Sequence, residues 1–405
     1  MECAQRHDLP DAVLALILRR LSMFELVGSA LLVNKQWNQV TRRELGEVRF
    51  LDLAAIARTS KTFILDAFRI VKLLAFLPRL KSISVHNWPL RNVDVAAVVL
   101  RYVKSEHIRQ VNLSGHVFEQ EQLKEFLLAC PNVTHLVLAR CDKVDAKMLR
   151  QACDLLKHSL MSVDVSECPK IDRDAIQVLL AAGVENVRAH SCASLTGAVS
   201  LSTVSAGHKR ASVLPSGVNL DLSHCKNMKQ LQILGSALRI KTLTMNGAIS
   251  LLEIYLVDET LLQLESIIAA QCGKLSSIRI ASSEGSVNEN LSLPKLASLN
   301  FYGARQLGSE SVGRICHASS SSLRYLNLNG VCGPEFRTLS ASLPSLRECD
   351  LRGCRYLEAV HLAFGPSLEA LMFSRKSPLT DVVLCAVPRS ADITGARPSF
   401  QIYFL

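Results

Sequence analysis

The sequence predicts an α/β solenoid in which a small helical module is followed by a curved array of about thirteen repeats. Two observations predict this fold. The pattern L-x-x-L-x-L-x-x-C recurs along most of the chain, usually every 22 to 28 residues, and such self-similarity is the signature of stacked repeats. Residues 9–37 instead carry short helical patterns. Because each repeat packs only on its neighbours, a chain of 405 residues can form one continuous array.

Three helices are predicted in the N-terminal module, residues 6–46. Pro10 suits the first turn of a helix, where its missing N–H costs nothing. The apolar stripe of this first helix consists of Leu14, Ile17 and Leu21. Ser22 and Glu25 form a capping box that begins a second helix. Asn34 can cap a third helix, which carries Trp37.

The repeats of residues 47–374 are aligned on their apolar positions. Side chains at the first, fourth and sixth positions point inward from a short strand, so that adjacent strands stack into a parallel sheet on the concave side. The ninth position, often Cys, lies where the chain turns. The predicted repeats begin at Val48, Leu80, Ile108, Val133, Leu160, Val184, Gly217, Ile240, Leu264, Leu296, Leu323, Leu346 and Leu368.

The segments that return to the next strand are of two kinds, and both are expected on the convex side. Apolar residues spaced three and four apart predict helices in residues 119–130, 145–159 and 172–183. Short alternating or apolar runs predict extended return segments in 229–233, 251–255 and 276–280. Leu251 also fits the repeat template, but its offset from the preceding turn predicts a return segment and not an extra repeat.

Three segments depart from the repeat pattern. Residues 193–217, rich in Ser, Gly and Ala, are predicted to be an inserted loop, and residues 281–293 resemble them. After Arg375 the pattern is lost and three prolines follow, which predicts an irregular C-terminal cap or tail over 375–405.

The N-terminal module resembles an F-box, and the repeats resemble cysteine-containing leucine-rich repeats; together they resemble the F-box/leucine-rich-repeat family. This resemblance implies a substrate-recognition subunit of an SCF-type cullin–RING E3 ubiquitin ligase. Its F-box would bind a Skp-type adaptor, and through it a cullin, while the repeats bind a protein substrate for ubiquitination and degradation. The alternative is a leucine-rich-repeat scaffold without a ubiquitin role, whose N-terminal helices only cap the array. The residues expected at the adaptor site are Leu9, Pro10, Leu14, Ile17, Leu21, Leu26, Val33 and Trp37, the last also serving the module's own core.

The composition gives no sign of catalysis, and we predict no catalytic residue, metal or cofactor. Of the thirteen cysteines, six occupy the turn position of a repeat, no C-x-x-C pair exists, and their odd number argues against a disulfide framework. The net charge of +10 comes from scattered residues and aromatic residues make up only 5%, which favours a solvated basic surface over a nucleic-acid groove. No apolar run approaches the ~18 residues that span a bilayer, so we expect a soluble protein of the cytoplasm, the nucleus or both.

The residues that flank the inward positions of each strand are expected on the concave face. Most are small and polar. The candidate substrate-binding residues on this face are Arg188, Tyr302, Tyr325, Asp350 and Arg352, because Tyr and Arg are enriched at interface hot spots. The alternative is that they are ordinary solvent-facing residues of a repeat sheet. No dense Arg/Lys cluster of the kind that binds a phosphorylated segment is visible.

Overall fold

The computed structural model describes most of the chain, in two compact units. The first unit comprises Met1–Lys143 and Gln151–Leu160, and the second comprises Val144–Arg150 and Met161–Leu405. The structure describes residues 9–59, 67–88, 94–157, 159–202, 217–234, 239–257, 262–281, 292–375, 378–386 and 401–404.

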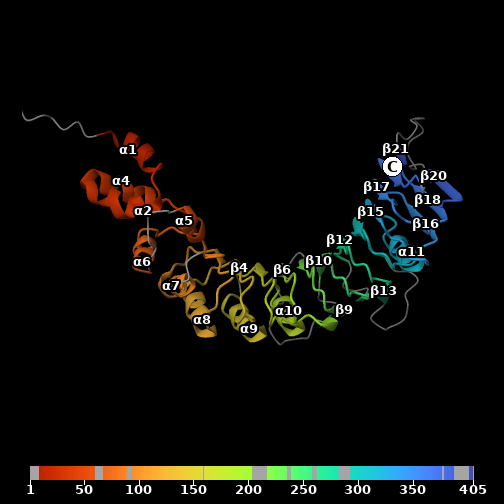
Figure 1. Cartoon of the computed structure of the whole chain (residues 1–405), viewed down its shortest axis with the longest axis horizontal. Coiled ribbons are helices and arrows are strands. Elements are labelled where there is room, and N and C mark those ends of the chain that lie inside the picture. Colours follow the sequence, from red (N-terminus) through yellow and green to blue (C-terminus); the bar gives the residue numbers. More distant parts are fainter. Residues whose placement is uncertain are drawn as a thin grey trace, which may run out of the picture. The chain divides into compact units, whose positions relative to one another are not determined.

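The first unit contains the N-terminal helices and four strands that form a parallel sheet in the order β1-β2-β3-β4. The helices α6, α7 and α8 of successive repeats pack side by side in chain order (Figure 1). Its elements are α1 (Asp11–Leu18), α2 (Met23–Glu25), the π-helical turn η1 (Leu26–Ala30), α3 (Leu31–Val33), α4 (Lys35–Gly46), β1 (Phe50–Asp52), α5 (Leu53–Thr59), α6 (Ala67–Ala75), β2 (Ser82–Ser84), α7 (Val95–Tyr102), β3 (Gln110–Asn112), α8 (Gln120–Ala129) and β4 (His135–Val137). Helix α9 (Ala146–Leu155) has residues in both units.

The second unit contains a longer parallel sheet in the order β5-β6-β8-β10-β12-β14-β15-β17-β19-β21 (Figure 1). The fourth and sixth positions of its repeats are buried almost throughout, as the template predicts. The strands of this sheet are β5 (Ser162–Asp164), β6 (Asn186–Arg188), β8 (Val218–Asp221), β10 (Ile240–Thr244), β12 (Ser266–Ile268), β14 (Ser298–Asn300), β15 (Tyr325–Asn327), β17 (Glu348–Asp350), β19 (Ala370–Phe373) and β21 (Gln401–Phe404).

Return segments of the second unit form two further parallel sheets and two helices. One sheet has the order β7-β9-β11-β13 and the other has the order β16-β18-β20. The elements are α10 (Arg173–Ala181), β7 (Gly197–Ser202), β9 (Met228–Leu234), β11 (Glu253–Val257), β13 (Ser277–Ala281), α11 (Ser309–Ala318), β16 (Thr338–Leu343), β18 (Ala359–Phe364) and β20 (Asp381–Ala386). The predicted helical and extended return segments are therefore confirmed, and the segment at Leu251 belongs to β11 and not to an extra repeat.

Helix α11 closes an edge of both return-side sheets. The Ser311 hydroxyl accepts a hydrogen bond from the backbone N–H of Ile278 in β13, at 3.2 Å. The Ser309 hydroxyl accepts one from the N–H of Thr338 in β16, at 3.1 Å. These contacts satisfy edge donors that would otherwise be open to another strand. No sequence pattern predicted this helix among the extended return segments.

The turns that follow the main-sheet strands from β2 to β17 each place one residue in the left-handed region. Gly303, Gly330 and Gly353 occupy this place with φ of 70°, 75° and 69°, and Gln271 occupies it with φ of 60°. Each turn is tied to the next repeat: the N–H of Gly303, for example, donates to the carbonyl of Asn329 at 2.7 Å. Glycine adopts this conformation without steric cost, which explains why it recurs at this turn position.

The turn cysteines join neighbouring repeats. The thiols of Cys141, Cys192, Cys225, Cys272 and Cys354 donate to a backbone carbonyl of the preceding repeat, as Cys225 does to Ala189 at 3.3 Å and Cys272 to Met245 at 3.0 Å. Burial raises the pKa of the Cys141, Cys225 and Cys272 thiols to about 11. The turn cysteines thus bridge repeats as neutral donors.

Two segments differ from their sequence-based prediction. Part of the predicted loop 193–217 is the strand β7, in which Val199 and Leu201 alternate with small residues and are buried; residues 203–216 and most of 281–293 lie outside the described residues. The predicted irregular segment after Arg375 contains β20, which pairs with β18, and β21, which pairs with β19. The template missed β21 because its first position is Ser399 and not an apolar residue.

Replacing Gly303 by Ala should lower the free energy of unfolding by about 1–2 kcal/mol. An added Cβ meets only ordinary contacts, the closest at 3.6 Å, so the penalty is backbone strain. Gly273→Ala is the matched control, since Gly273 has open space and no positive φ. Chemical denaturation of both variants decides the point; equal midpoints would contradict it.

The free energy of unfolding should fall as the pH rises from about 9 to about 11. The folded thiols stay protonated up to the folded pKa of about 11, whereas unfolded thiols ionise near ~8.5. Their contribution is therefore complete below the unfolded pKa and is lost as the pH passes through the folded one. Chemical denaturation across this pH range measures the decline. It should be shallower in a Cys225→Ala, Cys272→Ala double variant, and an identical pH profile would contradict the account.

Candidate partner-binding surfaces

The N-terminal module is held together by helix caps that the sequence predicted. Ser22 and Glu25 form the capping box, with the Ser22 N–H donating to the Glu25 carboxylate at 2.7 Å. The Asn34 side chain accepts a hydrogen bond from the N–H of Trp37 at 2.8 Å and so begins α4. These caps fix where α2 and α4 start, and thereby how the short second helical segment packs against α4.

Helices α1 and α4 pack against each other. Leu14 and Leu18, one turn apart on α1, are fully buried, and Arg19 pairs with Glu44 of α4 at 2.8 Å. The Gln36 side chain donates to the carbonyl of Leu9 at 2.6 Å and to the Asp11 carboxylate at 3.0 Å. The start of α1 is therefore tied to the start of α4, a contact that sequence patterns did not reveal.

This packing leaves an exposed apolar surface on the module, which we call the N-terminal apolar surface. Two segments form this surface. The hydrogen bond from the Gln36 side chain holds the segment at Leu9 beside the residues that precede α4. Helix α1 is thus apolar on its buried side and also on its solvent side. The surface consists of Leu9, Val13, Leu16, Ile17, Leu32 and Val33.

The predicted adaptor residues divide into exposed and buried ones. Leu9, Pro10, Ile17 and Val33 are exposed and Leu21 and Trp37 are half-buried. Leu14 and Leu26 lie in the module's core, so the structure does not support their prediction as direct contacts. The F-box resemblance marked them by residue type and place in the sequence, and these do not distinguish a core face from a partner face when both are apolar. It did not single out Leu16 and Leu32, which are both exposed.

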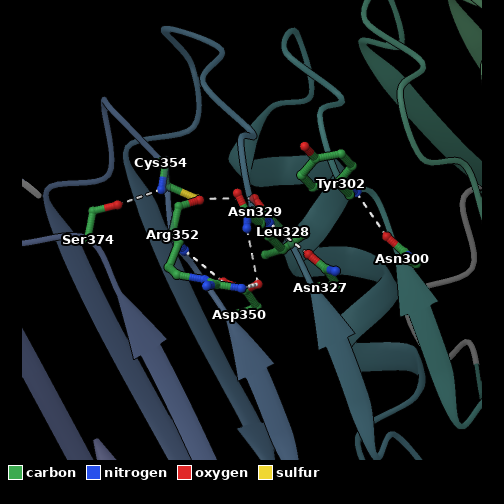
Figure 2. Close-up of polar contacts among 10 residues, drawn as sticks. Asn300, Tyr302, Asn327, Leu328, Asn329, Asp350, Arg352, Cys354 and Ser374 are labelled. Atoms are coloured by element: carbon green, nitrogen blue, oxygen red, sulfur yellow. Dashed lines mark hydrogen bonds and ion pairs between the residues drawn. The ribbon is translucent and has the colours of Figure 1, made fainter. Parts of the chain in front are cut away.

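A second candidate surface is formed by the residues at the third, fifth and seventh positions of the repeats in the second unit, which we call the strand face. Arg188, Tyr302 and Tyr325 are exposed on it. Asp350, in contrast, is only 7% exposed. Figure 2 shows the reason, which is that the Arg352 guanidinium and the Asn329 amide both turn toward its carboxylate.

The Asp350–Arg352 pair is bidentate. Nε and Nη2 of Arg352 donate to the two carboxylate oxygens at 2.9 and 2.8 Å, and Nδ2 of Asn329 adds a third bond at 3.2 Å. Burial alone would raise the pKa of Asp350, but the hydrogen bonds from Arg352 and Asn329 outweigh it, so the pKa is lowered. The prediction of Asp350 as a partner-binding residue is therefore not supported, because its oxygens are already occupied.

No group of three or more His, Cys, Asp or Glu side chains is placed to hold a metal ion within the described ranges. None of the helices the structure describes is long and apolar enough to cross a membrane. What both surfaces offer is contact area for another macromolecule.

Residues 7–47 match the F-box domain family, close to the predicted span of 6–46. Comparison with curated protein sequences gives no significant match. The chain resembles a chain in the crystal structure of the yeast Rad7–Elc1 complex, with 14% identity over 97% of this chain and 92% of that one and a TM-score of 0.35.

Two bacterial leucine-rich-repeat structures are also similar. The leucine-rich-repeat-containing protein LegL7 from Legionella pneumophila shares 16% identity over 62% of this chain and 89% of its own, with a TM-score of 0.29. An internalin (InlF) from Listeria monocytogenes shares 13% identity over 86% of this chain and 92% of its own, with a TM-score of 0.32. These likenesses are too distant to inform function.

The F-box match and the repeat geometry together define the class of protein. The chain consists of an F-box domain followed by an α/β solenoid of leucine-rich repeats.

Leu14→Ala should lower the free energy of unfolding of the N-terminal module by about 2–5 kcal/mol, because it leaves a cavity in a closed core. Leu32→Ala should change it by less than about 0.5 kcal/mol, since Leu32 is 75% exposed and Leu14 fully buried. Thermal unfolding of both variants makes the comparison. Equal losses would show that the two leucines are not divided between core and surface.

Proposed function

We propose that this chain is the substrate-recognition subunit of an SCF-type cullin–RING E3 ubiquitin ligase. The observation that carries the proposal is that the residues matching an F-box domain also present the N-terminal apolar surface. In the proposal this surface binds a Skp-type adaptor, and through it a cullin, while the repeats bind the protein to be ubiquitinated and degraded. Ubiquitin transfer belongs to other subunits, in the cytoplasm, the nucleus or both.

The physical basis is the cost of leaving so much apolar side chain in water. Six large apolar residues are exposed within 25 residues of one small module, whereas soluble monomers expose few contiguous apolar patches, and larger ones mark interaction sites. A helix that is apolar all round is normally buried on all sides, so α1 requires a second partner beyond α4. An adaptor that covers Leu16 and Leu32 would supply it.

The repeats suit recognition better than chemistry. Their strand face presents side chains from many consecutive strands at regular spacing, and its backbone groups are already bonded within the sheet. A solenoid of this kind offers an extended binding surface. Selection of a substrate by such a face needs no residue of this chain to take part in bond making or breaking.

A Leu16→Asp, Leu32→Asp variant should bind a purified Skp-type adaptor at least ~100-fold more weakly than the wild type, because a carboxylate would be buried unpaired in an apolar contact. Pulldown and titration calorimetry give the affinity. The circular dichroism spectrum should not change, since both positions are exposed.

Leu128→Asp is the matched control, because Leu128 is an exposed leucine on α8, outside the F-box. It should leave adaptor binding unchanged. If the wild-type chain fails to bind the adaptor, or if the double variant binds as well as the wild type, the proposal fails. The chain would then be a repeat scaffold whose N-terminal helices are only a cap.

A further inference from the structure

Three repeats of the second unit present a three-by-three arrangement on the strand face. Strands β14, β15 and β17 are paired in register, and the turns that follow are tied by backbone bonds from Gly303 to Asn329 and from Gly330 to Arg352. Each row therefore runs across the three strands at about 4.8 Å spacing. The rows are Ser298, Tyr325 and Glu348; Asn300, Asn327 and Asp350; and Tyr302, Asn329 and Arg352.

The only cation of this arrangement is already neutralised. Arg352 is held by the two oxygens of Asp350 at 2.8 and 2.9 Å and lies flat along its own repeat (Figure 2). A phosphate or carboxylate from a partner would have to displace a bidentate carboxylate that is nearly buried. This part of the strand face is therefore poorly suited to an anionic ligand.

The row of Ser298, Tyr325 and Glu348 places a carboxylate beside an aromatic ring. Tyr325 and Glu348 are register partners on adjacent strands, and both are exposed. Their outer neighbours in the row are the small Ser298 and Ala370. Within the part of the chain that the structure describes, Glu348 forms no ion pair. A carboxylate next to a tyrosine ring is complementary to a lysine or arginine side chain, which gains both a charge-assisted hydrogen bond and a cation–π contact.

The charge of the whole strand face agrees with this preference. Across the second unit it carries four carboxylates and two guanidinium groups, a net charge of −2, although the chain as a whole has +10. The six residues are Asp164, Asp221, Glu348, Asp350, Arg188 and Arg352. The face is thus acidic against a basic background, and this contrast directs a basic partner toward it.

We propose that the strand face of the second unit binds a lysine- or arginine-rich segment of a partner protein, with one basic side chain held between Tyr325 and Glu348 and neighbouring residues of the segment on Tyr302. This inference rests on the proposed function and deepens it, because it names the substrate class. Tyr302 and Tyr325 are 43% and 41% exposed, so both rings are available as contact area without a change in the sheet.

Selection of a displayed random dodecapeptide library on the purified full chain tests the inference. Peptides enriched by the wild type should be rich in Lys and Arg, and the charge-reversed Glu348→Lys variant should lose that enrichment. In fluorescence anisotropy, the most enriched synthetic peptide should bind Glu348→Gln and Tyr325→Ala at least ~10-fold more weakly. Its affinity for the wild type should fall as salt is added.

Glu310→Gln is the matched control, because Glu310 is an exposed acid on α11, outside the strand face. It should leave peptide binding unchanged. Enrichment of acidic or phosphorylated peptides, the absence of any selected peptide, or equal binding to Glu348→Gln would each overturn the inference. Adaptor binding by the same variants is measured in parallel: if it persists while peptide selection fails, the inference falls and the proposed function stands.

Discussion

Each repeat relies on its neighbours to bury its apolar positions, and the rest of the structure depends on this mutual burial. A strand of three residues cannot be stable alone. The side chains at the fourth and sixth positions of each repeat must therefore pack against those of the adjacent repeats. The left-handed turn residue and the buried cysteine then bond the turns together. Both features fix one register, because a shift of a single residue would turn the apolar side chains to solvent.

That constraint divides the molecule into inward and outward residues and leaves the outward ones free for recognition. On the strand face the outward residues are mostly polar and form a sparsely charged, acidic surface. The F-box domain follows a different rule, since α1 buries Leu14 and Leu18 yet also exposes Leu16 and Ile17. The exposed surface of the F-box domain is therefore apolar, whereas the strand face of the second unit is mostly polar.

The periodicity of apolar residues predicted the thirteen repeats, but it did not predict strands whose residues depart from the apolar pattern. All thirteen repeat starts are followed by a main-sheet strand, because the inward positions are fixed by register. β7 was hidden by its Ser- and Gly-rich composition, and β21 by Ser399 at its first position. Residue type identified Arg352 as notable, but only the structure reveals that Asp350 neutralises it, since that pairing depends on side-chain rotamers at the end of one strand.

The central claim is that the outward apolar face of the F-box domain is the adaptor site and the repeats are not part of it. Hydrogen–deuterium exchange of the full chain, with and without a purified Skp-type adaptor, tests this claim most directly. The account predicts that the adaptor slows exchange in α1 and in the segment from α2 to the start of α4, with no change in the strands of either unit. Protection spread over the repeats, or no protection in α1, would contradict it.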